Sequence, residues 1–310
     1  MKKRKPTKRR SNKRQSAQPP ITSPHSMDKV MSDLSKLLAQ HEFASIEEVN
    51  AFLDANVNGM AMPSFAPETP LEEAQELMFA AWETRLPKKR IQLARKALKI
   101  SPDCADAYVL LAEEEARSVE EARDLYAAGM AAGERALGEE FDEMVGHFWG
   151  ITKTRPYMRA RAGLAMTLWF LDQPEAAITH YKQMLHLNPG DNQGIRYTLL
   201  NALLSHGTAE EIEELLQMYP DDAAAAWLFS WALFAFSHGP RPEANNRLAE
   251  AISYNEHVPA YLLKRRRLPR QLPEYRGFGD ESEAAHYVYD SQHHWQTTPS
   301  ALTWLQEQIG

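Results

Sequence analysis

The chain contains a 34-residue unit, from Arg161 to Ile195, after which the same kind of pattern begins again. Its first half places Leu164, Ala165 and Leu168 at spacings of one and three residues, and its second half places Ala177 four residues before Tyr181. Apolar and small residues at spacings of three and four predict amphipathic helices. A proline after the second helix cannot continue it, because proline has no backbone N–H to donate. The unit is therefore predicted to be a pair of antiparallel helices.

The spacing and residue types of this unit resemble the tetratricopeptide pattern, in which helix pairs stack into a curved array. Partial copies surround it. The copy before it has Tyr108-x-x-Leu111-Ala112 in its first helix and Ala122 and Tyr126 in its second. The copy after it runs from Ile195 to Ala202, with Thr208 at the start of its second helix. The last copy has Trp227 to Phe236 in its first helix and Ala244 and Leu248 in its second. Small residues such as Ala112, Ala165 and Ala177 are expected where paired helices approach most closely. The predicted fold class is all-α, a tetratricopeptide-like helical-hairpin solenoid.

Breaks in this pattern predict four regions. Residues 1–26 are a disordered basic arm, because they contain almost no apolar residues. Residues 27–68 form an N-terminal helical segment, in which Val30, Leu34, Leu37 and Leu38 make an apolar stripe. Residues 69–256 form the repeat array, with a glycine-rich insertion near 133–156. Residues 257–310 form a C-terminal cap with helices near 281–295 and 299–308.

Charge separates the arm from the body. The chain has a net charge of −7, but residues 1–14 contain nine basic residues and no acid, which leaves −16 for the remainder. An acidic body repels polyanions, so only the arm is expected to contact nucleic-acid phosphates, without sequence specificity. The candidate phosphate contacts are Lys2, Lys3, Arg4, Lys5, Lys8, Arg9, Arg10, Lys13 and Arg14.

Several classes of protein are disfavoured by composition. The apolar runs fall short of the ~20 residues that span a bilayer, so we expect no membrane partner. The basic N-terminus is followed by polar residues rather than the apolar core of a secretory signal. A single cysteine, Cys104, argues against internal disulfides and a cysteine-based zinc site. We predict a cytoplasmic protein without cofactors.

Two longer stretches resemble the suppressor of tumorigenicity 7 family. They are SPDCADAYVLLAEEEARSVEEA at 101–122 and YRGFGDESEAAHYVYDSQHHW at 275–295, and HVPAYLL at 257–263 adds to the match. The resemblance covers roughly residues 95–310. It implies a tetratricopeptide-like region followed by the Gly279 to Ala284 segment and a helix containing Gln292 to Trp295, and it implies no known catalytic chemistry. Animal members are thought to carry membrane-spanning helices near the N-terminus, and this sequence shows none.

The strongest candidate site for a partner is a basic and aromatic patch at the start of the best repeat. Arginine side chains recognise carboxylates with two parallel hydrogen bonds, and the first helices of tetratricopeptide units line the concave surface. The next repeat supplies a further arginine and an asparagine, although the apolar Ala162 and Met166 make a full carboxylate clamp doubtful. The candidate residues are Arg155, Tyr157, Arg159, Arg161, Arg196 and Asn201.

Other motifs favour ordinary structural roles. His286, Asp290 and His293 share a helix face at metal-ligand spacing, but spacing alone is weak evidence for a metal. The segment Gly277 to Asp280 lacks the features of a phosphate loop and is expected to cap a helix. Glu113 to Glu115 read as a solvated helix face, and Cys104 as a small core thiol.

These observations predict a non-enzymatic adaptor that binds an unidentified protein or peptide in the concave groove of the solenoid. The alternative is a protein associated with nucleic acid or ribosomes through its basic arm. An enzyme is third, because no nucleophile and base pair is recognisable.

Overall fold

The computed structural model describes residues 24–56 and 65–310, and all regular structure in these ranges is helical. The α-helices are α1 (Pro24–Ala39), α2 (Ile46–Asn56), α3 (Pro70–Glu83), α4 (Pro87–Ile100), α5 (Ala105–Glu114), α6 (Val119–Leu137), α7 (Arg155–Phe170), α8 (Pro174–Leu187), α9 (Ile195–His206), α10 (Ala209–Met218), α11 (Ala225–His238), α12 (Arg241–Tyr254), α13 (Val258–Leu262), α14 (Glu281–Thr297) and α15 (Ala301–Ile309).

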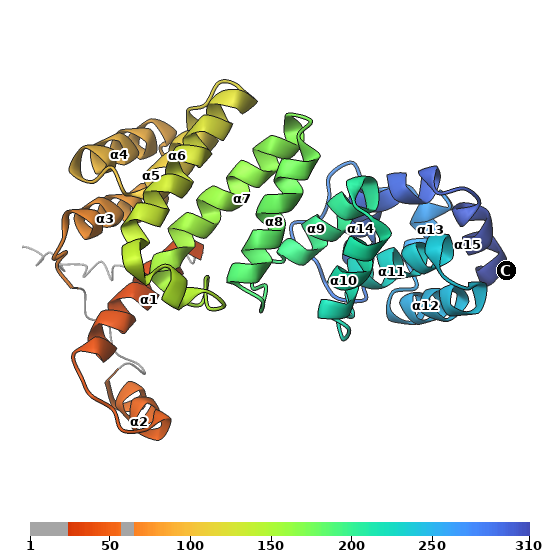
Figure 1. Cartoon of the computed structure of the whole chain (residues 1–310), viewed down its shortest axis with the longest axis horizontal. Helices are drawn as coiled ribbons and strands as arrows, with labels where there is room; N and C mark the ends of the chain where they lie inside the picture. Colours follow the sequence, from red (N-terminus) through yellow and green to blue (C-terminus); the bar gives the residue numbers. More distant parts are fainter. Residues whose placement is uncertain (1–23, 57–64) are drawn as a thin grey trace, which may run out of the picture.

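Five helical hairpins follow one another along the long axis of the molecule (Figure 1). They pair α3 with α4, α5 with α6, α7 with α8, α9 with α10, and α11 with α12. Helices α13 to α15 close the C-terminal end, where α14 packs on α9 and α11 and α15 packs on α12. This arrangement confirms the prediction of an all-α, tetratricopeptide-like array of hairpins with C-terminal capping helices.

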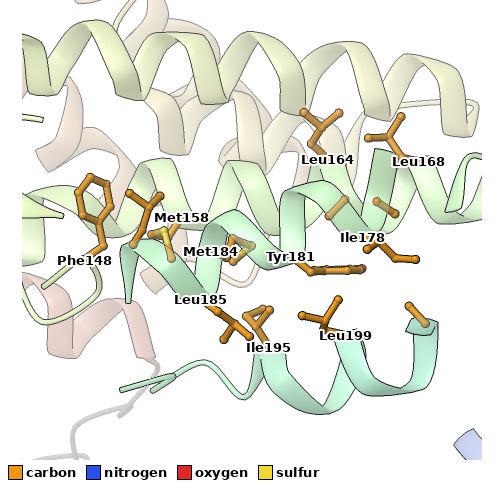
Figure 2. Packing of buried hydrophobic residues seen from close by; sticks show 14 of the residues in the cluster. Phe148, Met158, Leu164, Leu168, Ile178, Tyr181, Met184, Leu185, Ile195 and Leu199 are labelled. Carbon is orange, nitrogen blue, oxygen red and sulfur yellow. The ribbon is translucent and has the colours of Figure 1, made fainter. Parts of the chain in front are cut away.

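Alanines and leucines build the core as the repeat pattern predicts. Ala165 and Ala177 are fully buried where α7 meets α8, and Leu164, Leu168 and Tyr181 fill the space around them. Figure 2 shows Leu164, Leu168 and Tyr181 together with Ile195 and Leu199 of α9. A small residue at the crossing lets two helix backbones approach, while the large residues restore packing density on either side.

The buried residues separate into three clusters along the array. One joins α3, α4 and α5, the second extends from α5 to Trp227 at the start of α11, and the third joins α11 to α15. Each cluster is formed mainly by helices that are neighbours in sequence. This division is expected of a solenoid, whose units contact only the units beside them.

The predicted insertion near 133–156 is partly helix in the structure. Helix α6 continues to Leu137, and Gly133 lies inside it at a point where an added Cβ would be 2.9 Å from the Cβ of Tyr157. Glycine at this position allows α6 to contact α7 closely. Three short 3-10 turns then lie within residues 138–154, and Phe148 from the same stretch is fully buried against Phe141 and Tyr157.

The N-terminal helices differ from the array because no apolar side chain described in them is fully buried. None of Val30, Leu34, Leu37 and Leu38, which form the predicted apolar stripe of α1, is buried, and α2 has no buried residue. Helix α1 begins at Pro24, within the segment predicted as an arm, and residues 1–23 lie outside the described residues. The limits of the four predicted regions stay predictions.

Candidate partner-binding groove

The first helices of the hairpins, α3, α5, α7, α9 and α11, form one surface, which we call the first-helix face. Helix α1 lies on its N-terminal part, where it packs against α3 and against the turn that precedes α7. The turn supports this position because the hydroxyl of Thr154, which is buried, accepts a hydrogen bond from the backbone N–H of Trp149 at 3.0 Å. A helix from outside the repeats therefore occupies part of the surface that was predicted to hold a partner.

Two arginines of α7 converge on one carboxylate of α1. Arg155 pairs through Nη1 with Oδ1 of Asp28, and Nη1 of Arg159 lies 2.7 Å from Oδ2 of the same residue. Nε of Arg155 also donates to the backbone carbonyl of Trp149 at 2.7 Å, which fixes the direction of its guanidinium group. Only 5% of Asp28 is exposed. We call this arrangement the Asp28 clamp.

Arg159, the second arginine of the clamp, is also held by a carboxylate of α5. Nε and Nη2 of Arg159 donate to the two carboxylate oxygens of Asp106 at 2.8 and 2.7 Å, and Gln75 of α3 donates to Asp106 at 2.9 Å. Burial alone would lower the pKa of Arg159, but Asp106 and Asp28 outweigh burial and raise that pKa. Arg159 therefore keeps its charge, and one polar network joins α1, α3, α5 and α7.

Charged side chains hold the rest of α1. Lys29 lies 2.7 Å from Glu76, and Lys36 lies 2.8 Å from Glu72, so both lysines pair with acids of α3. The buried side chains of α1 from Met27 onward are two aspartates, Asp28 and Asp33. Contacts of this kind are weakened by salt, whereas apolar burial is not. Beside α1, a cavity of about 170 Å³ opens between α3, α5 and α7.

Tyr157 and Arg161, which were predicted with the clamp arginines, lie inside the array. Arg161 donates through Nη1 to the hydroxyl of Tyr157, and both residues are buried. The ring of Tyr157 packs edge-on against Phe141 and Phe148, and burial raises the pKa of its hydroxyl. In this structure the two residues therefore connect α7 to the core, and neither lies on the groove surface.

Arg196, the arginine of the next repeat, joins two loops. Its Nη1 lies 2.9 Å from Asp191 in the loop before α9, and its Nε lies 2.5 Å from Asp222 in the loop before α11. Tyr197 completes this network because its hydroxyl donates to Asp222 at 2.8 Å. The guanidinium group of Arg196 is thus engaged within the chain rather than presented to a ligand.

Asn201 connects the first-helix face to the C-terminal helix α14. Its Oδ1 accepts a hydrogen bond from Nε2 of His294, and its Nδ2 donates to the carbonyl of Asp290 at 3.4 Å. Burial and the neighbouring His293 lower the pKa of His294 to about 4, so the imidazole is neutral at physiological pH. Helix α14 thus covers α9 and α11 much as α1 covers α3 and α7.

An open groove remains between α9, the start of α11 and α14, with a volume of about 470 Å³. Asp290 and Arg276 lie on its α14 side, 3.7 Å apart, and the ring of Phe278 is 83% exposed at the groove. The other lining residues are mainly polar, namely Gln193, Gly194, Tyr197, Thr198, Asn201, Ala224, Ala226, Glu283, Tyr287 and Ser291.

The remaining candidate motifs take part in local structure. His286, Asp290 and His293 form no metal-binding group, and none of three or more suitable side chains occurs in the described parts of the chain. Instead, His286 contacts the carbonyl of Pro273 at 2.9 Å. Asp280 caps α14 by accepting hydrogen bonds from two backbone N–H groups, as the sequence indicated.

The acidic and thiol motifs of α5 also have structural partners. Glu114 and Glu115 pair with Arg90 and Arg95 of α4, so this acidic run joins two helices rather than facing solvent freely. Burial and the nearby Asp106 raise the pKa of Cys104 to about 12, which agrees with a core thiol.

Comparison with known proteins supports the resemblance found in the sequence. Residues 46–221 match the model of the family described as ST7 protein, which is more than half of the chain. The chain belongs to the ST7 family. A human relative, suppressor of tumorigenicity 7 protein-like, is 29% identical over 262 residues that cover 76% of this chain and 45% of the relative. The Drosophila melanogaster ST7 homolog is 25% identical over 290 residues, covering 85% of this chain and 54% of the relative.

The chain spans about half the length of these ST7 relatives. Among solved structures, YrrB, described as a tetratricopeptide protein with an unusual peptide-binding site, is 19% identical with a TM-score of 0.42 and covers 66% of this chain and 90% of YrrB. In the parts of this ST7 chain that the structure describes, every helix is too short or too polar to cross a membrane.

Sequence reasoning missed the acidic half of the clamp. Asp28 lies on the polar side of an amphipathic helix, and Asp106 lies between two alanines in the first, apolar part of α5. An acid in that apolar stretch was the available signal, because a buried carboxylate needs a cation as partner. Nothing in the sequence says which of the 35 basic residues would supply it.

Proposed function

We propose that this ST7-family chain is a non-enzymatic binding module that holds a helix or peptide of a partner protein on the first-helix face through one of its carboxylates. The Asp28 clamp is the observation that supports this function. Two arginines are fixed by Trp149 and Asp106 so that they present two cationic donors to one incoming carboxylate. In this structure the carboxylate comes from α1, which acts as an internal occupant of the site.

The clamp is ordered before a ligand arrives, which favours binding. Arg159 is held by Asp106 whether or not Asp28 is present, so little side-chain entropy is lost when another carboxylate replaces it. An arginine that bonds both oxygens of a carboxylate is also more selective than a lysine, since its donors are fixed in a plane. A partner would then present a carboxylate on a helix with flanking basic residues, as α1 presents Lys29 and Lys36 to Glu76 and Glu72.

The proposed function is consistent with the predicted cellular location and with the predicted C-terminal cap. A binding module without enzymatic activity fits a cytoplasmic protein, and the cap formed by residues 257–310 would protect the end of the array. The basic residues from Lys2 to Arg14 lie outside the described residues, so nucleic-acid binding remains a prediction from the sequence alone.

A peptide-binding experiment tests whether an added helix can replace α1 at the Asp28 clamp. In the full chain, Asp28→Asn removes the charge of the internal occupant while keeping its shape. A synthetic peptide of residues 24–40 with Asp28 should then bind the D28N chain, as measured by calorimetry or fluorescence anisotropy. The wild-type chain should bind the same peptide at least tenfold more weakly, because its own α1 competes at a high effective concentration.

Two controls distinguish binding at the Asp28 clamp from nonspecific electrostatic binding of the peptide. The peptide with Asn in place of Asp28 should not bind the D28N chain, and Arg155→Ala in the D28N chain should remove binding of the Asp28 peptide. Helicity of every variant is checked by circular dichroism. Equal binding of both peptides, or binding that survives loss of Arg155, would show that the first-helix face has no carboxylate site. Capture from the native host with D28N as bait, and with the D28N/R155A chain as control, would then identify the partner.

A further inference from the structure

The outer side of α4 is a basic surface that no helix of the described chain covers. Helix α4 belongs to the first hairpin and packs inward on α3 and α5. It contains no acidic residue, and Lys88, Lys96 and Lys99 are exposed without an ion-pair partner among the described residues. Two stripes of side chains face outward, formed by residues 88, 92, 95 and 99 and by residues 89, 93 and 96.

This surface combines charge with apolar contact area. Leu86, at the start of α4, is 63% exposed, and Leu93 is only half-buried between the lysines. In this array the second helix of each hairpin packs on the first helix of the next, as α4 packs on α5, and the outer side of α4 stays open in the described chain. The end hairpin therefore leaves an apolar strip exposed and surrounds it with positive charge.

Helix α2 has the complementary properties. It contains Glu47, Glu48 and Asp54 and no basic residue, and none of its side chains is buried. Phe52 packs on the adjacent loop through His41 and Phe43, with ring centroids 4.6 and 5.3 Å apart. Ile46 is 66% exposed, and Ile46, Val49 and Leu53 form an apolar stripe on α2 at spacings of three and four.

The position of α2 within the chain favours contact with another molecule. Helix α1 is fixed to α3 and α7 by the Asp28 clamp and by Lys29 and Lys36. Figure 1 shows α2 beyond α1, standing apart from the array, with α4 at the other side of α3. To reach α4 of its own chain, α2 would have to leave this position, whereas a second copy can bring its α4 to α2 directly.

We propose that α2 of one copy docks on the outer side of α4 of a second copy, and that the reciprocal contact forms a symmetric dimer. The acidic face of α2 would lie on the lysines, and the Ile46, Val49 and Leu53 stripe would cover Leu86 and Leu93. A two-fold arrangement forms both contacts at once and closes without further growth. Because solvent-exposed charges make much of the contact, dimerisation should weaken as ionic strength rises.

A charge exchange between two full-length variants tests the contact. The α2 variant carries Glu47→Lys, which leaves Asp54 and the helix-capping Glu48 intact. The α4 variant carries Lys88→Glu and Lys99→Glu, which leaves Arg95 paired with Glu115. Sedimentation velocity should show the wild-type chain shifting from one to two protomers with rising concentration, and its dissociation constant should rise at least tenfold at high salt.

Each variant alone should remain a monomer, because like charges then face each other. An equimolar mixture of the two should form a dimer again, since each heterologous contact pairs opposite charges. A variant with Arg267→Glu and Arg270→Glu at the C-terminal end makes a matched charge change and should dimerise like the wild-type chain. A wild-type chain that stays monomeric, or a mixture that does not dimerise, would overturn the proposal. Equal loss of dimer in the C-terminal control would also overturn it, because net charge would then be the cause.

Discussion

On the first-helix face, ion pairs of single residues join helices that elsewhere in the array are joined by apolar contacts. Arg159 is bonded to two carboxylates from two helices, and each of its partners is buried. Removing one member of such a network leaves an unpaired buried charge, which typically costs about 3–5 kcal/mol. Arg155 is different because its second partner is a backbone carbonyl, so it can lose Asp28 without leaving another side chain unpaired.

His294 gives a prediction for the effect of pH. Its pKa is about 4 in the folded chain and 6.5 as the unperturbed value, because burial and His293 oppose the charged form. As the pH falls from 6.5 toward 4, the unfolded chain binds a proton that the folded chain does not, so the free energy of unfolding decreases. The full effect is on the order of 3 kcal/mol.

The measurement is chemical denaturation of the wild-type chain and of His294→Gln at pH 7.5 and at pH 5. Glutamine keeps an N–H donor for Asn201 but does not titrate in this range. The variant should therefore lose less stability on acidification than the wild-type chain. Parallel losses in both proteins would mean that His294 does not carry the effect.

Gly163 gives a prediction for packing between hairpins. An added Cβ would lie 2.2 Å from Cε1 and 2.4 Å from Cδ1 of the Tyr126 ring, so Gly163→Ala should overpack the contact between α6 and α7. We expect a loss of about 1–3 kcal/mol in thermal or chemical unfolding. Tyr126→Leu in the same chain should recover part of this loss, which a double-mutant cycle would detect. Alanine is the better helix former, so a stabilised G163A chain would contradict the structure.

At the scale of elements, α1 and the array are held by different forces. The hairpins bury alanines and leucines, as their spacing predicted, whereas α1 buries Asp28 and Asp33 and leaves its apolar stripe only partly buried. The sequence identified both as amphipathic helices. It did not indicate that α1 would face the array with its polar side, since that depends on acids and bases contributed by α3 and α7.

This difference predicts that salt releases α1 selectively. Raising the ionic strength screens the pairs of Lys29 and Lys36 with α3, because these side chains are partly exposed. Hydrogen exchange measured by mass spectrometry should therefore become faster in residues 27–39 at high salt, while exchange in α8 should not change. Helix α8 is a suitable reference because its buried side chains are mainly apolar. Equal acceleration in both helices would indicate general destabilisation instead.

At the scale of the whole molecule, three buried clusters suggest that the ends of the array respond separately. Leu248 of α12 is fully buried in the cluster of α11 to α15, and Leu110 of α5 is buried in the cluster of α3 to α5. Each Leu→Ala change should cost about 2–5 kcal/mol locally. In an array whose units contact only their neighbours, the loss should appear mainly at the mutated end.

Hydrogen exchange of the two variants checks this prediction. L248A should accelerate exchange in α11 to α15 more than in α3 to α5, and L110A should do the reverse. The variants serve as controls for each other, because both remove the same atoms from a buried site. Acceleration that is uniform over the molecule in both variants would mean that the three clusters unfold as one unit.

The sequence alone determined the helical class, the pairing of helices and many core positions. These follow from periodic spacing and from the small residues Ala165 and Ala177, which are local in the chain. It also indicated the ST7 family and the cap at Asp280. Local patterns are sufficient for these features because each hairpin contacts mainly its neighbours.

Only the tertiary structure decided what the predicted site residues do. Arg155 and Arg159 meet Asp28, which is more than 120 residues earlier in the chain, while Arg161 and Tyr157 turn into the core and Arg196 joins two loops. Ion pairs of this kind have no fixed spacing in sequence, because an acid and a base from distant parts of the chain can pair once the fold brings them within about 4 Å. The clamp on the first-helix face is therefore a property of the folded array.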